Sequence, residues 1–207
     1  LAIALEMGYG SHEAFTRAFR EQFGTTPEAV RKQGHFENIV LVEAFSMNTL
    51  KLTRLEPPRW ENGKVLLIAG LTERIDCENG GAIPQLWQRF VPYLGNVPGQ
   101  VGKNAYGVSY NTDDAGNMDY MCGVEVAEFS GVPREFGRLR IPEQRYVVFF
   151  HRDHISSIRS TFNTIWTQWL PESGHEVVDA PFFELYSEKF NGLTGLGGVE
   201  LWIPIAK

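Results

Sequence analysis

Two short stretches near the C-terminus carry acidic and aromatic residues at alternate positions, the spacing that places side chains on one face of a β-strand. Glu200 and Trp202 share a face of a predicted final strand, and Phe182, Glu184 and Tyr186 share a face of the predicted strand before it. Aromatic rings on an exposed face would forgo about 1.5 to 3 kcal/mol of burial each. We therefore expect these side chains to line a pocket.

Such a pocket suits a flat, apolar ligand with a positive charge. Cation–π contact contributes about 0.5 to 2 kcal/mol per ring. A buried, pocket-facing position would raise the pKa of Glu200 by desolvation unless a cation or hydrogen-bond donors compensate. Tyr110 and Glu125 join the candidates as counterparts of Tyr186 and Glu200 in an internal repeat. A structural explanation stays open, because strand aromatics usually pack in the core and an acid on a sheet face is usually solvated.

Other patterns that could do chemistry are weaker. His151 and His154 flank Asp153 but have no third credible metal ligand, and Asp153 is better explained as a helix N-cap. The glycine-rich 192–198 stretch has no G-K-(S/T), so it is not a phosphate-binding loop. No catalytic Ser/His/Asp or Cys/His pairing has support, and we expect neither a metal nor another cofactor.

Composition limits the class of protein. The chain has 207 residues, a formal net charge of -6 and 43% hydrophobic residues, which is typical of a folded globular protein. It has no apolar run of the roughly 18 to 20 residues that a membrane helix needs, no signal peptide and only two cysteines. These features predict a soluble, cytoplasmic protein. Leu1 opens in the middle of an apolar pattern, which indicates a truncated chain.

The elements that must position these residues fall into two parts. Residues 1–34 predict a helix ending at Gly8, a second helix capped by Ser11 and ended by Gly24, and a third capped by Thr25 or Thr26. Two helices around a tight glycine turn are typical of a helix-turn-helix, although a three-helix packing element has the same periodicity. A linker at 35–48 follows, and 49–207 forms the second domain.

The second part alternates strands and amphipathic helices, which predicts an α+β fold with an antiparallel sheet. A helix beginning at Ile83 is expected to pack on the sheet, and a later helix is expected to end at Pro171. The strands are expected at 51–56, 65–71, 106–110, 118–126, 139–141, 146–150, 182–186 and 199–203.

The order of these elements repeats. Gly123-Val124-Glu125-Val126 precedes Gly198-Val199-Glu200-Leu201 by 75 residues, and Tyr110 precedes Tyr186 by 76. The repeat predicts a tandem duplicated β-β-α-β-β module with two main helices.

The first part resembles the second helix-turn-helix of AraC/XylS transcription regulators. The matching residues are Ala4, Gly8-Tyr9, Ser11, Phe15, Arg17-Ala18-Phe19, Phe23-Gly24, Thr26-Pro27 and Arg31. The resemblance implies that duplex DNA is a partner and that the usual first helix-turn-helix is missing. Contacts to DNA are expected from Ser11, His12, Thr16, Arg17 and Arg20, with an arginine reaching guanine or phosphate.

The second part, from about residue 50, resembles the GyrI-like effector-binding domain. The resemblance rests on Trp166-x-x-Trp169-Leu170-Pro171 with Gly174, Phe183-Glu184-Leu185-Tyr186 and the closing Val199-Glu200-Leu201-Trp202-Ile203-Pro204-Ile205. It implies that Glu200, the acid of the closing strand, recognises cationic drugs.

Together the two resemblances predict a transcription regulator that responds to a small organic effector, cationic or amphipathic, and that is not an enzyme. Two alternatives stay open. The chain could hydrolyse reactive cyclopropane-bearing toxins, with Glu200 as general base and Trp202 or Tyr186 holding the substrate. It could also be a gyrase-inhibitor-like module that binds a protein partner.

Overall fold

The computed structural model describes residues 11–23, 25–33, 52–76, 80–113 and 115–206. The chain divides into two compact units, Leu1–Thr49 and Leu50–Lys207, which we treat separately. No helix within the described ranges is long and apolar enough to cross a membrane.

The first unit contains helices α2 (His12–Phe23) and α3 (Pro27–Gln33). Both predicted caps are confirmed: the Ala14 N–H donates to Ser11 Oγ over 3.1 Å, and the Ala29 N–H donates to Thr26 Oγ1 over 3.2 Å. These oxygens satisfy backbone donors that have no partner within the helix. The predicted helix ending at Gly8 and the 35–48 linker lie outside the described residues, and the AraC-type assignment stays a prediction.

The second unit is built on an eight-stranded antiparallel sheet in the order β1-β6-β8-β7-β3-β4-β2-β5. The predicted α+β class and antiparallel sheet are confirmed. The strands are β1 (Arg59–Gly63), β2 (Leu66–Asp76), β3 (Gln100–Tyr110), β4 (Asn117–Val126), β5 (Gly137–Ile141), β6 (Gln144–His151), β7 (Phe182–Tyr186) and β8 (Val199–Pro204).

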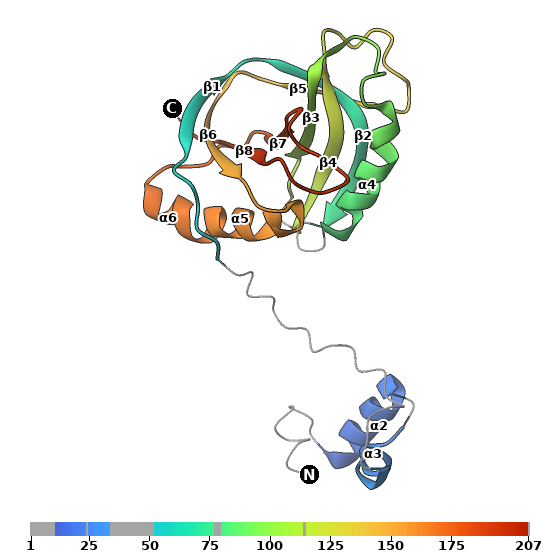
Figure 1. Cartoon of the computed structure of the whole chain (residues 1–207). Coiled ribbons are helices and arrows are strands. Elements are labelled where there is room, and N and C mark those ends of the chain that lie inside the picture. The colour runs from blue at the N-terminus through green and yellow to red at the C-terminus, as the bar shows by residue number, and fades with distance from the viewer. Residues whose placement is uncertain (1–10, 24, 34–51, 77–79, 114, 207) are drawn as a thin grey trace. The chain divides into compact units, whose positions relative to one another are not determined.

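The sheet curls onto itself, as Figure 1 shows. β1 pairs with β6 from Arg59 opposite Val148 onward, and β2 pairs with β5 as far as Gly70 opposite Gly137. Neither pairing has a register shift. Since β1 leads directly into β2 and β5 into β6, the two ends of the strand order are tied together. The result is a strongly curled sheet with an inner and an outer face.

Two helical segments cover the outer face (Figure 1). The first is α4 (Ile83–Phe90), followed by a 3-10 turn at Val91–Tyr93. The second runs through a 3-10 turn (Ile155–Ser157), α5 (Ile158–Thr164), a π-helical segment (Ile165–Trp169) and α6 (Leu170–Ser173). A further 3-10 turn at Gly80–Ala82 precedes α4.

Three expectations about these elements are wrong. Pro171 does not end the second helix: it lies in the first turn of α6, where its missing N–H needs no partner, and the helix ends at Gly174 with φ 70°. His154, not Asp153, caps the 3-10 turn by accepting from the Ser156 N–H. The described residues of 51–56 form no strand, because this segment packs on the second helix, where the Thr53 N–H donates to Thr164 Oγ1 over 2.9 Å.

The strand order reads the same from both ends of the sheet. From one end it is β1, β6, β8 and β7, and from the other it is β5, β2, β4 and β3. If each strand of β1 to β4 is matched with the strand four places later, β5 to β8, the two orders are equivalent. A duplicated module is compatible with this order. The duplication itself stays a prediction.

Candidate functional site

The two acids that the sequence placed in one pocket lie on opposite faces of the sheet. β7 and β8 pair with Glu184 opposite Leu201 and Leu185 opposite Glu200. Residues directly opposite one another in a sheet share a face, so Glu184 faces outward with Leu201 while Glu200 faces inward. The prediction of a single pocket for both acids is therefore wrong. The predicted faces within each strand were correct, but the two acids are offset by one residue in the pairing of β7 with β8.

On the outer face, Glu184 is the acceptor of a buried hydrogen-bond network. Its Oε2 atom accepts from the hydroxyls of Tyr120, over 2.8 Å, and Tyr186, over 2.6 Å. The Tyr120 oxygen in turn accepts from Trp87 Nε1 over 3.2 Å, and the Trp87 and Tyr186 rings meet edge to face at 4.9 Å. We call Glu184, Tyr120, Tyr186 and Trp87 the outer-face cluster. It joins β4, β7 and α4.

Gly107 makes this arrangement possible. It lies on β3 opposite both Glu184 of β7 and Cys122 of β4. A Cβ atom at this position would collide with the Tyr120 hydroxyl and would lie 2.7 Å from Glu184 Oε2. The glycine thus leaves the space through which Tyr120 reaches across β3 to Glu184.

Burial controls the electrostatics of the cluster. Glu184 is only 8% exposed, and none of the described lysine, arginine or histidine residues forms an ion pair with it. Desolvation raises the pKa of the Glu184 carboxyl, although the hydrogen bonds from Tyr186 and Tyr120 oppose this shift. Burial, together with the Glu184 charge, also raises the pKa of both tyrosines well above the ordinary value.

On the inner face, Glu200 has a different environment. Its side chain is 27% exposed, and its Oε2 atom accepts from Arg59 Nη2 over 2.8 Å and from Trp202 Nε1 over 3.0 Å. The Arg59 guanidinium also lies 5.8 Å from the centre of the Trp202 ring. Glu125, the predicted counterpart of Glu200, is similarly paired with Lys64 over 2.8 Å. The expected desolvated acid is therefore Glu184 and not Glu200.

Trp202 has a core role on this face. Its ring stacks on Phe183 with centres 5.2 Å apart and meets Tyr146 edge to face at 5.5 Å. Tyr106 and Phe183 continue the same aromatic row, with centres 5.9 Å apart. These contacts match the structural explanation of aromatic residues in strands.

The remaining ligand candidates, Phe182 and Tyr110, lie at a surface hollow of about 530 Å³. Phe182 meets the rings of Phe162 and Trp166, both at 5.9 Å, and so also contacts the second helix. The other lining residues are Ser109, Asn111, Thr112, Leu139, Asp179, Ala180 and Pro181.

Sequence reasoning named Glu184 and Tyr186 but missed Tyr120 and Trp87. Tyr120 alternates with buried residues of a predicted strand, and Trp87 lies on the apolar side of a predicted helix, so each looks like an ordinary core residue. The only available signal was that both carry a polar atom that needs a partner when buried.

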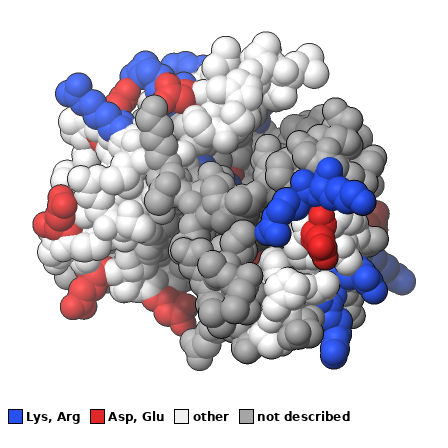
Figure 2. Space-filling view, turned by 90° about the horizontal axis from the view of Figure 1, so that it is seen from below, with Lys and Arg blue, Asp and Glu red and all other residues white. Residues whose placement is uncertain are grey.

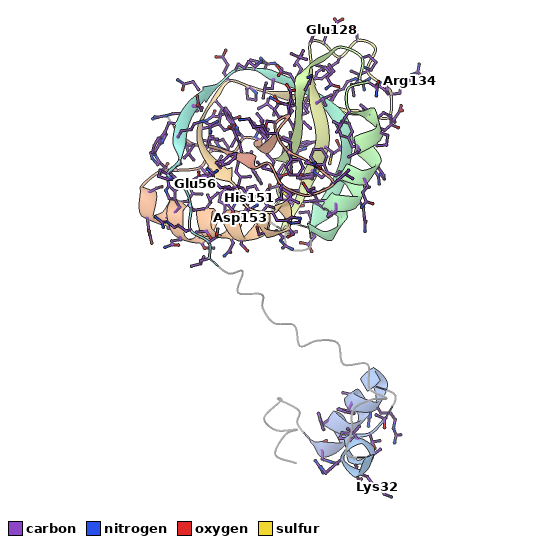
Figure 3. All side chains as sticks on the ribbon, in the orientation of Figure 1. Lys32, Glu56, Glu128, Arg134, His151 and Asp153 are labelled. Atoms are coloured by element: carbon purple, nitrogen blue, oxygen red, sulfur yellow. The ribbon has the colours of Figure 1, made fainter. Side chains whose placement is uncertain are left out.

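His151 is committed to structure. Its Nδ1 atom lies 2.8 Å from Thr161 Oγ1, and its Nε2 atom lies 3.2 Å from the carbonyl oxygen of His154. Figure 3 shows His151 and Asp153 where β6 leads toward α5. In the part of the chain that the structure describes, no group of three or more His, Cys, Asp and Glu residues could hold a metal ion.

In the first unit, the predicted DNA contacts differ in availability. His12, Arg17 and Arg20 are exposed on α2, whereas the Ser11 hydroxyl caps the helix. Thr16 Oγ1 is buried without a hydrogen-bond partner, so the expectation that it contacts DNA is not supported. Basic and acidic side chains both occur on the face in Figure 2, and the visible surface does not carry one sign of charge.

Comparison with known proteins shows which family this chain resembles. A family model described as the GyrI-like small molecule binding domain matches residues 58–206. The transcriptional regulator BrlR of Pseudomonas aeruginosa is 34% identical over 128 residues, which cover 61% of this chain and 47% of BrlR. The chain thus spans about half the length of this curated relative.

Solved structures agree on the fold. SAV2435 bound to tetraphenylphosphonium has a TM-score of 0.61 and 19% identity, over 73% of this chain and 94% of that chain. The EcmrR C-terminal domain has a TM-score of 0.52 and 17% identity, over 74% and 99%. At these identities the likeness shows the fold alone. By its match over residues 58–206, the chain belongs to the family of GyrI-like small-molecule binding domains.

Proposed function

We propose that the second unit binds a small organic cation or amphipathic cation at the outer-face cluster. One observation carries this proposal: Glu184 is a buried carboxyl whose hydrogen-bond partners are phenols, with no ion pair to any described base. A buried acid is expensive unless a cation or donors compensate it. An incoming cation supplies the missing charge.

The surrounding rings suit the same ligand class. Tyr120, Tyr186 and Trp87 come together around Glu184, and an aromatic ring attracts a cation with about 0.5 to 2 kcal/mol. SAV2435, a relative in fold, has been solved with tetraphenylphosphonium, a permanent apolar cation. That relative supports the choice of this cation as the first probe.

Affinity for tetraphenylphosphonium in Glu184→Gln tests the assignment. The substitution keeps the shape and removes the charge, so the affinity should fall by about 2 to 5 kcal/mol, the usual cost of removing one partner of a buried charge pair. Trp87 supplies a fluorescence readout, because its ring contacts Tyr186.

Glu200→Gln is the matched control, because Glu200 lies on the opposite face and already has Arg59. Its affinity should stay near that of the unaltered protein, and a neutral analogue such as triphenylphosphine oxide should bind Glu184→Gln and the unaltered protein alike. A loss in Glu200→Gln and not in Glu184→Gln would move the site to the inner face.

Binding is favoured over hydrolysis. The hydrolase alternative needs Glu200 as a general base, but its Oε2 atom accepts from both Arg59 and Trp202. Both interactions occupy one of the two carboxylate oxygens that could accept a proton from water. Absence of turnover of a cyclopropane-bearing electrophile is the expected result.

We further propose that this binding domain serves a transcription regulator, with the AraC-type first unit as its DNA-binding part. BrlR, a transcriptional regulator, supports the regulatory role. Arg17 and Arg20 on α2 are exposed and can reach DNA. For this chain alone we expect only non-specific binding to duplex DNA, with Kd of about 10⁻⁴ to 10⁻⁶ M at physiological salt. Nanomolar, sequence-specific binding in a titration would contradict this expectation.

The second unit itself is proposed to descend from a tandem duplication. The matching strand order of its halves supports this origin. Superposition of the halves should bring Val124 onto Val199 and α4 onto α5, and a poor fit of these elements would count against it.

A further inference from the structure

Where the structure describes them, the elements around Glu184 bring no free positive charge to it. β4 contributes Tyr120 and Cys122, β7 contributes Tyr186, and α4 contributes Trp87, all uncharged at neutral pH. The opposing strand residues, Gly107 of β3 and Leu201 of β8, are neutral.

The charged groups near this region are matched with one another. Arg89 of α4 is paired with Glu73 of β2 over 2.5 Å, so this pair adds no net charge. The second helical segment packs Ile165 and Trp169 on the same outer face, and both are neutral. In the described part of the chain, Glu184 thus faces phenols, an indole, a thiol and apolar groups.

We propose that Glu184 holds a proton in the ligand-free protein and exchanges this proton for the positive charge of the ligand. The inference rests on the proposed binding function and adds its regulation by pH. On binding, the carboxyl O–H bond breaks, the proton passes to solvent, and the electron pair remains on the carboxylate that faces the cation. The net charge of the buried site, counting the ligand, is then zero both before and after binding.

The hydrogen-bond geometry fits this exchange. Both tyrosine hydroxyls donate to Oε2, which leaves Oε1 to carry the proton. Trp87 donates to the Tyr120 oxygen, and this bond directs the Tyr120 hydrogen toward Glu184. Desolvation, the larger influence, raises the pKa of Glu184 and favours the protonated form, whereas the two tyrosine bonds favour the carboxylate.

The exchange fixes the sign of the pH dependence. Because binding releases a proton, the association constant rises with pH by up to about tenfold per unit below the pKa of the ligand-free carboxyl. Above that pKa the carboxyl is already ionised and the affinity becomes constant. A neutral ligand does not need the ionised carboxylate and should not gain affinity as the pH rises.

Calorimetric titration with tetraphenylphosphonium tests the exchange directly. This cation has no titratable proton, so a difference in apparent binding enthalpy between two buffers of unequal ionisation heat counts protons from the protein. About one proton should be released per cation at pH values below the Glu184 pKa. Glu200→Gln should release the same number, whereas Glu184→Gln, where binding is measurable, should release none.

Infrared spectroscopy gives a second readout on the ligand-free protein. A carboxylic acid C=O band that disappears on cation binding and is missing from Glu184→Gln is expected. Binding with pH-independent affinity, no proton release and no such band would overturn the exchange while the proposed function stands. Absence of cation binding at every pH would reject both.

Discussion

Glu184 and Glu200 occupy adjacent strands, each between apolar neighbours, yet they differ in almost every physical property. Glu184 is covered by the helices of the outer face and bonded to phenols, whereas Glu200 is partly exposed on the inner face and bonded to Arg59. The chemistry of an acid in a sheet therefore depends on what covers the face to which it points. Burial under the helices removes water and raises the free energy of the charged carboxylate, whereas a nearby base at an open position lowers that free energy.

The two acids also differ in whether their charge is already balanced by a base. The ion pair of Glu200 with Arg59 needs no further partner, and such partly exposed pairs contribute only about 0 to 1 kcal/mol. The Glu184 carboxyl has no counter-charge among the described residues, so a cationic ligand can change its protonation state. Four measurements on the protein and its variants test this difference between the two acids.

The largest effect is expected from Gly107→Ala, which places a methyl group where the outer-face cluster closes. The new Cβ would collide with Tyr120 and crowd Glu184. Overpacking of this kind costs about 1 to 3 kcal/mol, measured as the free energy of unfolding in urea. Gly192→Ala is the control, because its Cβ would meet no atom within 4 Å, and it should change stability by less than about 0.5 kcal/mol. Equal stabilities for both variants would contradict close packing at Glu184.

The pH dependence of stability comes next in size. With its pKa raised on folding, Glu184 binds more protons in the native than in the unfolded protein. Its contribution is therefore complete below the ordinary glutamate pKa and is lost as the pH rises toward the native pKa, by up to about 1.4 kcal/mol per unit. Urea unfolding across this range should show that Glu184→Gln loses less stability than the unaltered protein. Parallel curves would show that Glu184 does not titrate differently on folding.

A smaller effect is expected from removal of one phenol donor. Tyr186→Phe deletes the 2.6 Å hydrogen bond to Glu184 and should cost about 0.5 to 1.5 kcal/mol of unfolding free energy. It should also raise the pKa of Glu184 further, because one bond to the charged form is lost. Tyr106→Phe, on the inner face, removes a longer 3.4 Å contact with Glu125 and a hydrogen bond with Asn104, and is the comparison. A larger loss in Tyr106→Phe would reverse the ranking of the two faces.

The smallest effect is expected from Arg59→Gln. It removes the ion pair of Glu200 while leaving the outer-face cluster untouched, and it should change the unfolding free energy by about 0 to 1 kcal/mol. The change should shrink as salt screens the pair. A loss of several kcal/mol that salt does not alter would mean that Glu200 behaves as a buried acid.

Local pattern was a good guide to the elements and a poor guide to their assembly. Ser11 and Thr26 were identifiable as caps because a cap depends on a few adjacent residues. The same holds for the face that Glu184 shares with Tyr186 within β7. Pro171 misled because its effect depends on the π-helical segment that precedes α6, and this irregularity has no pattern in the sequence.

Sequence by itself determined the α+β class, the antiparallel strands and the acid and aromatic residues from which a site could be built. Alternation and periodicity are properties of one segment, and a single chain displays them directly. Tertiary structure alone decided that Glu184 and Glu200 face opposite ways and that Tyr120 and Trp87 join Glu184. A shift of one residue between β7 and β8 inverts their shared faces, and the packing of the whole curled sheet against its helices sets that register.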